Sequence, residues 1–268
     1  MVSENNLEPR LVRIRVYPIK SLDPVEVQQT SIGPSGALEH DRAWALYSVD
    51  GRWVNAKRTA AMHLIRAAYA PDLSRVTLTV PGDRREMFSA ELDFPSDTER
   101  AAEWFCAYFE QQISVRYSAD GFPDDTLASG PTIVSTASLE AAAAWFALDT
   151  DEVRLRFRAN LEIDGVPAFW EDQLFAEDAN GTVRFRIGDV NFEGSNPCAR
   201  CPVPARDAHT GADFVGFQKH FAEMRRAELP AWSPQERFDH FYRFSTNTRV
   251  PPTECGKVLR VGDVLLIS

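Results

Sequence analysis

The sequence has few cysteines, a deficit of positive charge and no long apolar run. Only four of its 268 residues are cysteine, which is too few for a disulfide framework and fits a reducing compartment. Acidic residues outnumber lysine and arginine by 39 to 29, and this excess disfavours general binding to nucleic acid or to an anionic membrane. No segment reaches the roughly 20 apolar residues of a membrane span. The polar stretch from Met1 to Arg10 lacks the pattern of a secretory signal. We therefore expect a cytoplasmic protein without a membrane or nucleic-acid partner.

What is present is a pattern of short strands. Apolar and polar residues alternate from Leu11 to Tyr17, as in a half-buried strand, and Asp50-Gly51 is typical of a hairpin turn. The same reasoning predicts strands over residues 11–17, 25–30, 43–49, 53–54, 74–80, 155–163, 182–187 and 189–193, and a hairpin-like apolar end over 258–267.

Helices are expected in four places. Ser96 to Glu99 forms a capping box before an apolar face, which predicts a helix over 97–111. Further helices are predicted over 135–148, over 215–228 and from a second capping box at Ser233 to Glu236. The segment 118–132 is rich in glycine, proline and aspartate, and we interpret it as a domain connection. The expected fold is mainly β with helices (α+β), with an N-terminal domain over 1–117 and a second domain over 118–268.

The sharpest local motif is the pair Cys198 and Cys201 in the stretch N-P-C-A-R-C-P. A structural zinc site would need a second ligand pair, whereas Cys106 and Cys255 are isolated. A thioredoxin-like redox pair would normally open a helix, which the prolines after Cys201 disfavour. A metal or sulfur site that uses one thiolate, and two buried cysteines without a function, also remain open.

Three basic segments could bind an anion. Lys20 and Ser21 follow a strand that ends at a proline, which suits a phosphate. Arg42 precedes an apolar strand. The alternating arginines of R-L-R-F-R, residues 154–158, are expected on one strand face, where like charges repel unless an anion or carboxylates neutralise them. Taken singly, each segment also fits a solvated surface, for example an edge strand protected by its charges.

The order of these motifs is far more specific than any one of them. Together they resemble the MOSC family with its N-terminal β-barrel domain. The matching segments are Pro18-Ile19-Lys20-Ser21, Asp41-Arg42-Ala43-Trp44, Arg156-Phe157-Arg158-Ala159-Asn160, Glu171-Asp172, Cys198-Ala199-Arg200-Cys201, Thr210-Gly211 and Val261-Gly262-Asp263. The resemblance implies a β-barrel-like MOSC domain, a smaller N-terminal barrel and a molybdenum cofactor (Mo-molybdopterin) between them.

The resemblance also implies the site residues. Cys201 matches the molybdenum ligand and is therefore the expected catalytic residue. The other residues expected to bind the cofactor are Lys20, Ser21, Arg42, Ser129, Arg158, Asn160, Ala199 and Arg200. Ala199 stands where many members have serine, which leaves only the backbone N–H at that position. Glu171 and Asp172 are candidate carboxylates near the site, without an assigned role in proton transfer.

The family includes amidoxime-reducing components, bacterial N-hydroxylamine reductases and the C-terminal domain of molybdenum-cofactor sulfurases. The resemblance therefore implies an oxidoreductase that reduces small N-hydroxylated substrates. Four cysteines, two of them in the motif, do not suffice for an additional four-cysteine iron–sulfur site. We therefore expect electrons from a separate flavin or iron–sulfur protein. The alternative is a molybdopterin-binding or sulfur-carrier module that holds a persulfide on Cys201 and has no turnover of its own.

Overall fold

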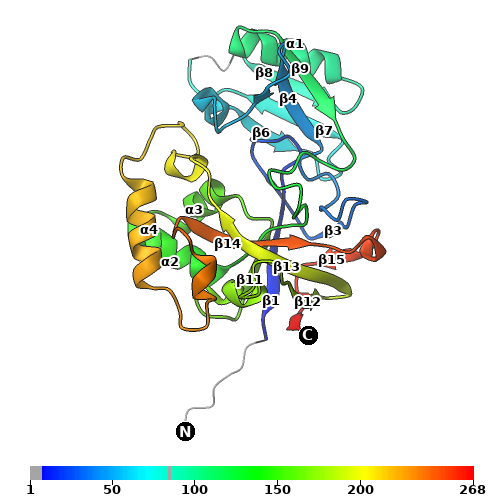
Figure 1. Cartoon of the computed structure of the whole chain (residues 1–268). Helices are drawn as coiled ribbons and strands as arrows, with labels where there is room; N and C mark the ends of the chain where they lie inside the picture. The colour runs from blue at the N-terminus through cyan, green and yellow to red at the C-terminus, as the bar shows by residue number, and fades with distance from the viewer. Residues whose placement is uncertain (1–7, 84–85) are drawn as a thin grey trace.

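A computed structural model describes residues 8–83 and 86–268 of the chain. Most of the polar N-terminal segment, in which no secretory signal is expected, therefore lies outside the described residues. Strands predominate and four α-helices accompany them in the described chain, so the predicted mainly β fold with helices is confirmed. Figure 1 shows two lobes, which we call the small lobe (residues 44–117) and the large lobe (the remaining described residues). None of the helices in the described residues has the length and apolar character needed to cross a membrane.

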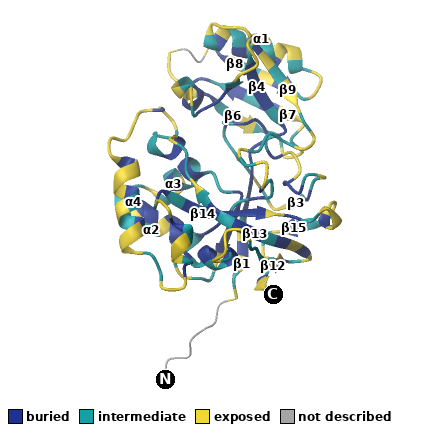
Figure 2. Cartoon of the chain, in the orientation of Figure 1, coloured by how far each residue is buried: buried dark blue, intermediate teal, exposed yellow. Residues whose placement is uncertain are grey.

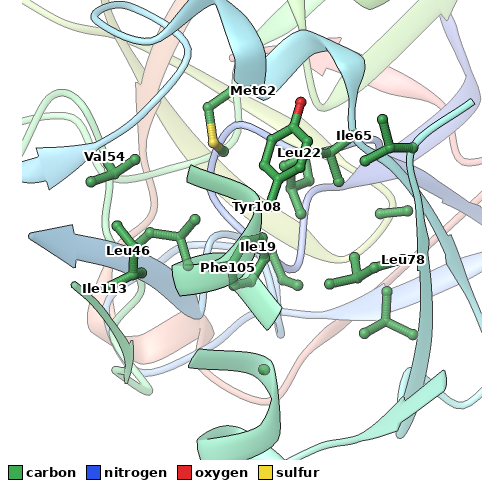
Figure 3. Close-up of a cluster of buried hydrophobic side chains, with 14 of the residues drawn as sticks. Ile19, Leu22, Leu46, Val54, Met62, Ile65, Leu78, Phe105, Tyr108 and Ile113 are labelled. Carbon is green, nitrogen blue, oxygen red and sulfur yellow. The ribbon is translucent and has the colours of Figure 1, made fainter. Parts of the chain in front are cut away.

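The small lobe contains two three-stranded antiparallel sheets and one long helix. One sheet has the order β5-β4-β9 and the other β6-β7-β8. Its elements are β4 (Trp44–Ser48), β5 (Trp53–Val54), the 3-10 helix η1 (Ala60–Leu64), β6 (Arg66–Tyr69), β7 (Arg75–Thr79), β8 (Ser89–Asp93), α1 (Thr98–Phe109) and β9 (Ile113–Tyr117). The lobe encloses a hydrophobic cluster, in which Figure 3 shows Phe105 of α1 with Leu46 and Leu78. Ile19, which comes from the chain before the small lobe, packs into the same cluster.

The large lobe is built on an eight-stranded sheet of order β16-β12-β13-β14-β10-β11-β1-β2. Its strands are β1 (Arg10–Val16), β2 (Val25–Val27), β10 (Ile133–Ser135), β11 (Leu161–Asp164), β12 (Val183–Ile187), β13 (Val190–Ala199), β14 (Arg243–Arg249) and β16 (Leu265–Ile267). Two short strands, β3 (Gln29–Ser31) and β15 (Val258–Arg260), pair beside it. Its helices are α2 (Thr136–Phe146), α3 (Thr150–Phe157) and α4 (Phe217–Ala227). These lie together at one side of the lobe (Figure 1). The burial colouring of the cartoon in Figure 2 places buried residues inside both lobes and exposed residues along α4.

Most predicted elements are present within a few residues of their expected ends, but four details are wrong. The segment 155–163 is not one strand, because α3 ends at Phe157 and β11 begins at Leu161. The C-terminal strands do not form a hairpin: β15 pairs with β3 and β16 pairs with β12. The second capping box yields only a 3-10 turn, Gln235–Arg237, and no cap bond from a side chain begins α1.

The predicted domain boundary between residues 117 and 118 stays a prediction. The first strands, β1 and β2, belong to the sheet of the large lobe, where β1 pairs antiparallel with β11. In the crossover between β1 and β2, Ile19 forms a bridge with Trp44 of the small lobe. The chain enters the small lobe itself at β4 and leaves it after β9. This crossover places the segment Lys20–Ser21 between the lobes, next to elements that come from much later in the chain.

Candidate functional site

A cavity of about 330 Å³ lies where the two lobes meet, and residues from both line its wall. All nine residues predicted to bind a cofactor lie in this wall, namely Lys20, Ser21, Arg42, Ser129, Arg158, Asn160, Ala199, Arg200 and Cys201. They come from the crossover after β1, the connection before β10, the end of α3 and the end of β13. The structure thus brings the predicted residues together, while their roles toward a cofactor stay predictions.

Lys20 and Ser21 are held in place by the small lobe. The backbone N–H of Lys20 donates to the carbonyl of Trp44, and the side chain is almost completely buried. Its Nζ donates to the Phe122 carbonyl over 2.6 Å and to the Asp124 carboxylate over 2.7 Å. Burial lowers the pKa of Lys20 to about 8, and the charge of Asp124 opposes this decrease. The Ser21 hydroxyl accepts a hydrogen bond from the N–H of Ala56, which fixes the two neighbouring loops.

Arg42 and Arg158 both lie against the ring of Tyr17. Their guanidinium carbons are 4.9 and 4.2 Å from the ring centroid. Arg42 pairs with Asp41, and Arg158 donates to the Leu22 carbonyl over 2.7 Å. Burial lowers the pKa of Arg158, and the nearby Arg42 adds to that effect. Within the described chain no carboxylate lies within ion-pair distance of Arg158, so an anion in the cavity would meet a cation that has no carboxylate beside it.

The predicted strand face of arginines at 154–158 is wrong. Arg154 and Arg156 lie on α3, where they pair with Glu162 and Glu152 over 2.8 Å. Arg158 is instead the residue that ends the helix, and its left-handed backbone turns its side chain into the cavity wall. Arg156 and Arg158 both line the cavity, but only Arg158 has no carboxylate partner in the described chain.

The cysteine motif leaves β13 and enters the cavity. Cys198 and Ala199 end the strand, and the Nη1 atom of Arg200 lies 3.1 Å from Cys198 Sγ. Arg200 also donates to the Phe157 carbonyl, whereas its buried Nε has no partner in the described residues. Burial opposes the charge of Arg200, but the two thiols, Cys198 first, raise its pKa above the usual value. Cys201 is half-buried against the hydrophobic cluster of the small lobe.

The cavity is positive although the chain is acidic. Eight lysine and arginine residues line it, against five aspartates. A local excess of cations in a chain of net charge −10 is expected where an anion binds. Together with a thiol and an orphaned guanidinium nitrogen, this donor set fits a large anionic cofactor whose metal takes a soft sulfur ligand. Across residues 8–83 and 86–268, no group of three or more histidine, cysteine or acidic side chains could hold a metal ion, so zinc would find no second ligand pair there.

Three of the predicted residues have an unusual backbone. The φ angles are 75° at Ser21, 53° at Arg42 and 56° at Arg158, in the left-handed region that L residues other than asparagine and aspartate seldom adopt. Non-glycine residues in this region concentrate at binding and catalytic sites, where the surrounding contacts hold them. Six other non-glycine residues of the described chain also have a positive φ and do not line the cavity, so this conformation is not specific to the site.

The remaining predicted residues differ in their placement. Asn160 is buried and accepts from Arg42 over 3.3 Å, and Ser129 donates to the Ser35 carbonyl over 2.7 Å. Glu171 and Asp172, expected near the site, are not among the cavity-lining residues. Both are buried inside the large lobe, where Glu171 accepts from Ser138 and Asp172 pairs with Arg225. Their proximity to the cavity is therefore not borne out.

Several cavity residues were not predicted from the sequence. They include Asp124, which pairs with Lys20 and with Lys57, and also His63 and Arg206. Asp124 lies in the glycine- and proline-rich connection, which was interpreted only as a linker. His63 has no neighbouring motif, and Arg206 lies between two motif segments without belonging to either, so the sequence alone does not mark them as site residues.

Comparison with known proteins agrees with this geometry. The sequence matches the MOSC N-terminal beta barrel domain over residues 8–148 and the MOSC domain over residues 130–265. It is 25% identical to the molybdenum cofactor sulfurase of Drosophila grimshawi, over 76% of this chain and 29% of that protein. It is 23% identical to the human sulfurase, over 85% and 30%. It is 24% identical to mitochondrial amidoxime-reducing component 1 of Xenopus laevis, over 74% and 66%.

The chain spans about three tenths of the length of the curated sulfurases that it matches. Among solved structures, the YUAD protein from Bacillus subtilis aligns with 96% of this chain and 93% of that chain, at a TM-score of 0.41 and 12% identity. The two domain matches each cover half of the chain or more, and they overlap over residues 130–148. The chain belongs to the MOSC family.

Proposed function

We propose that the protein is a molybdenum-cofactor-binding oxidoreductase that removes oxygen from N-hydroxylated compounds. The observation that carries this proposal is the cavity itself, in which Cys201 shares one wall with a surplus of cations. The similarity to an amidoxime-reducing component and to molybdenum cofactor sulfurases supports a cofactor of this kind. The net reaction would turn an N-hydroxylated substrate, two protons and two electrons into the amine or amidine and water.

The chain's own residues would bind and orient the cofactor. Cys201 would supply the thiolate ligand to molybdenum, because a soft sulfur donor suits this metal. Arg42 and Arg158 can grip a phosphate with paired N–H groups, while Lys20 contributes a point charge. Arg200, whose Nε has no partner in the described residues, lines the cavity together with the two thiols. When bound, the cofactor would supply the two-electron chemistry by cycling between Mo(IV) and Mo(VI).

The proposed reaction needs a separate electron-donor protein. We expect no second redox group in this chain, so a flavin or iron–sulfur protein would deliver the electrons. We place the reaction in the cytoplasm, in agreement with four cysteines that are all free in the structure.

The proposal is tested by Cys201→Ser in full-length protein from a host that makes molybdopterin. We expect about one molybdenum per chain in the wild type, and benzamidoxime reduction with reduced methyl viologen as donor. Both should be lost in Cys201→Ser. The matched control is Cys255→Ser, because Cys255 is exposed and does not line the cavity. Full activity of Cys201→Ser would contradict the proposal.

A sulfur-carrier function is the second candidate. The guanidinium of Arg200, 3.1 Å from Cys198 Sγ, would also stabilise a sulfur anion, and the sulfurase relatives agree with sulfur handling. In that case the purified protein would show a persulfide on Cys201 by mass spectrometry and no stoichiometric molybdenum. Stoichiometric molybdenum with turnover would exclude this candidate.

A further inference from the structure

Part of the cavity wall is not used by the predicted cofactor residues. His63, Arg66 and Arg206 line it, and none of them belongs to the motifs that resemble the family. His63 lies in η1 and Arg66 begins β6, both in the small lobe. Arg206 follows the 3-10 helix Val203–Ala205, which comes directly after the Cys201 segment. This part of the wall therefore adjoins the residue that would hold the metal, which is where a substrate has to bind.

His63 has an unsatisfied polar atom that is shielded from bulk solvent. The residue is only 8% exposed, and its Nε2 has no hydrogen-bond partner in the described chain. Burial lowers the pKa of His63 to about 4, and the charges of Arg158 and Arg206 lower it further. The imidazole is thus neutral at pH 7 and surrounded by positive charge. Buried polar atoms without partners are uncommon in folded proteins and call for a bound group that satisfies them.

The two arginines are fixed in position by the protein but keep donors for a ligand. Arg206 donates from Nη1 to the Ala56 carbonyl over 2.6 Å, and its Nε lies 3.3 Å from Asp213. The side chain of Asp213 is 80% exposed, so solvent screens this ion pair. Arg66 pairs with Asp23 over 3.2 Å, contacts His209 Nδ1 over 2.8 Å and donates from Nη2 to the His63 carbonyl. Its buried Nε is the nitrogen that has no partner in the residues that the structure describes. Guanidinium groups that are already oriented lose little entropy when they bind an anion.

We infer that His63, Arg66 and Arg206 form a subsite for an anionic group on the substrate, such as a carboxylate. The inference rests on the proposed function and narrows its substrate class to N-hydroxylated compounds that carry a negative charge. The anion would accept hydrogen bonds from the two guanidinium groups, and the N-hydroxyl end would then point toward Cys201. The subsite is distinct from the Lys20, Arg42 and Arg158 set that is predicted to bind the cofactor.

The test compares two probes that differ only in a carboxylate, benzamidoxime and 4-carboxybenzamidoxime. Binding to the molybdenum-loaded protein is measured by titration calorimetry without a reductant, so that no turnover occurs. We expect the wild type to bind the carboxylated probe about tenfold more tightly. Arg206→Gln should reduce this preference to nearly one, because glutamine can still donate to the Ala56 carbonyl but carries no charge. Arg184→Gln is the control, since Arg184 is 79% exposed on β12 and does not line the cavity.

The outcomes separate the two proposals. Equal binding of both probes by wild-type protein would overturn the subsite, as would a preference that survives in Arg206→Gln. Loss of the preference in the Arg184 control as well would show a general charge effect and would also overturn it. Binding of neither probe would contradict the subsite too, and the molybdenum content of the same sample tells whether the proposed function fails with it.

Discussion

Two regions of the large lobe take arginine side chains out of solvent in opposite ways. The side chain of Arg225 on α4 is almost inaccessible to solvent and pairs with the buried Asp172. The Arg225 guanidinium also lies over the ring of Phe169. Arg158 and Arg200 line the cavity, and in the described chain neither has a carboxylate within ion-pair distance. The protein thus neutralises the charge of Arg225 internally, while the charges of Arg158 and Arg200 remain available to a ligand.

The difference separates a structural charge from a functional one. A buried ion pair is destabilised strongly when one partner is removed, because the other charge stays behind without compensation. A cation that faces a cavity without a partner contributes little to folding, and its burial is unfavourable until an anion binds. Replacing each kind of arginine should therefore affect different measurements.

The largest effect is expected for Arg225→Met. This change leaves the Asp172 carboxylate buried without its partner and should lower the free energy of unfolding by about 3–5 kcal/mol. Urea denaturation measures the loss. The double variant with Asp172→Leu should recover much of it, since an apolar pair of similar volume can replace a buried ion pair. Molybdenum content should not change in protein that is still folded. A loss of molybdenum at full stability would contradict the distinction.

Glu171 lies next to Asp172 but has no arginine partner in the described chain, so the pH dependence of stability tests the same contrast. Burial, followed by the charge of Asp172, raises the pKa of Glu171 to about 7. Between pH 4.5 and 7 the unfolded chain releases this proton while the folded chain keeps it, so the free energy of unfolding should fall as the pH rises. The decrease amounts to about 3 kcal/mol over the window. Glu171→Gln should remove this contribution. Parallel stability curves for the two proteins between pH 4.5 and 7 would contradict the assignment.

The smallest effect on stability is expected for Arg158→Met. The substitution removes one hydrogen bond, from Arg158 to the Leu22 carbonyl. It also removes a buried guanidinium, whose pKa burial lowers. We expect the free energy of unfolding to change by less than about 1 kcal/mol, while molybdenum content falls at least tenfold. Urea denaturation and elemental analysis of one preparation give both values. A loss of stability as large as that of Arg225→Met would remove the contrast.

The sequence predicts the elements where periodicity and turn chemistry agree. The β4–β5 hairpin follows from Asp50-Gly51, and α1 from its apolar face. The stretch 154–158 misled because arginines at every second position imitate a strand. The buried residues of α3 are Val153, Arg156 and Phe157, a helical spacing, and Asp149 caps the helix through the N–H of Asp151. The acidic start of this helix was a signal that the alternation concealed.

The site was predictable only where motifs carry it. The order of the motifs identified nine cavity residues, although Lys20 and Cys201 are about 180 residues apart in the sequence. His63 and Arg206 depend on how the two lobes meet, which no local pattern encodes. Glu171 and Asp172 show the reverse error, because the order of the motifs predicted that they lie near the site, whereas the structure buries them in the large lobe.

The left-handed backbone at Ser21, Arg42 and Arg158 has a consequence for evolution in the laboratory. Glycine adopts such angles without the steric penalty of a side chain, roughly 1 kcal/mol per position. A screen that rewards only thermal resistance should therefore accept glycine at Arg158, which has no carboxylate partner, more readily than at Arg42, whose loss would leave the buried Asp41 unpaired. A clone with glycine at Arg158 would relieve the backbone and lose a side chain of the cavity wall, so selection for robustness alone would erode the site.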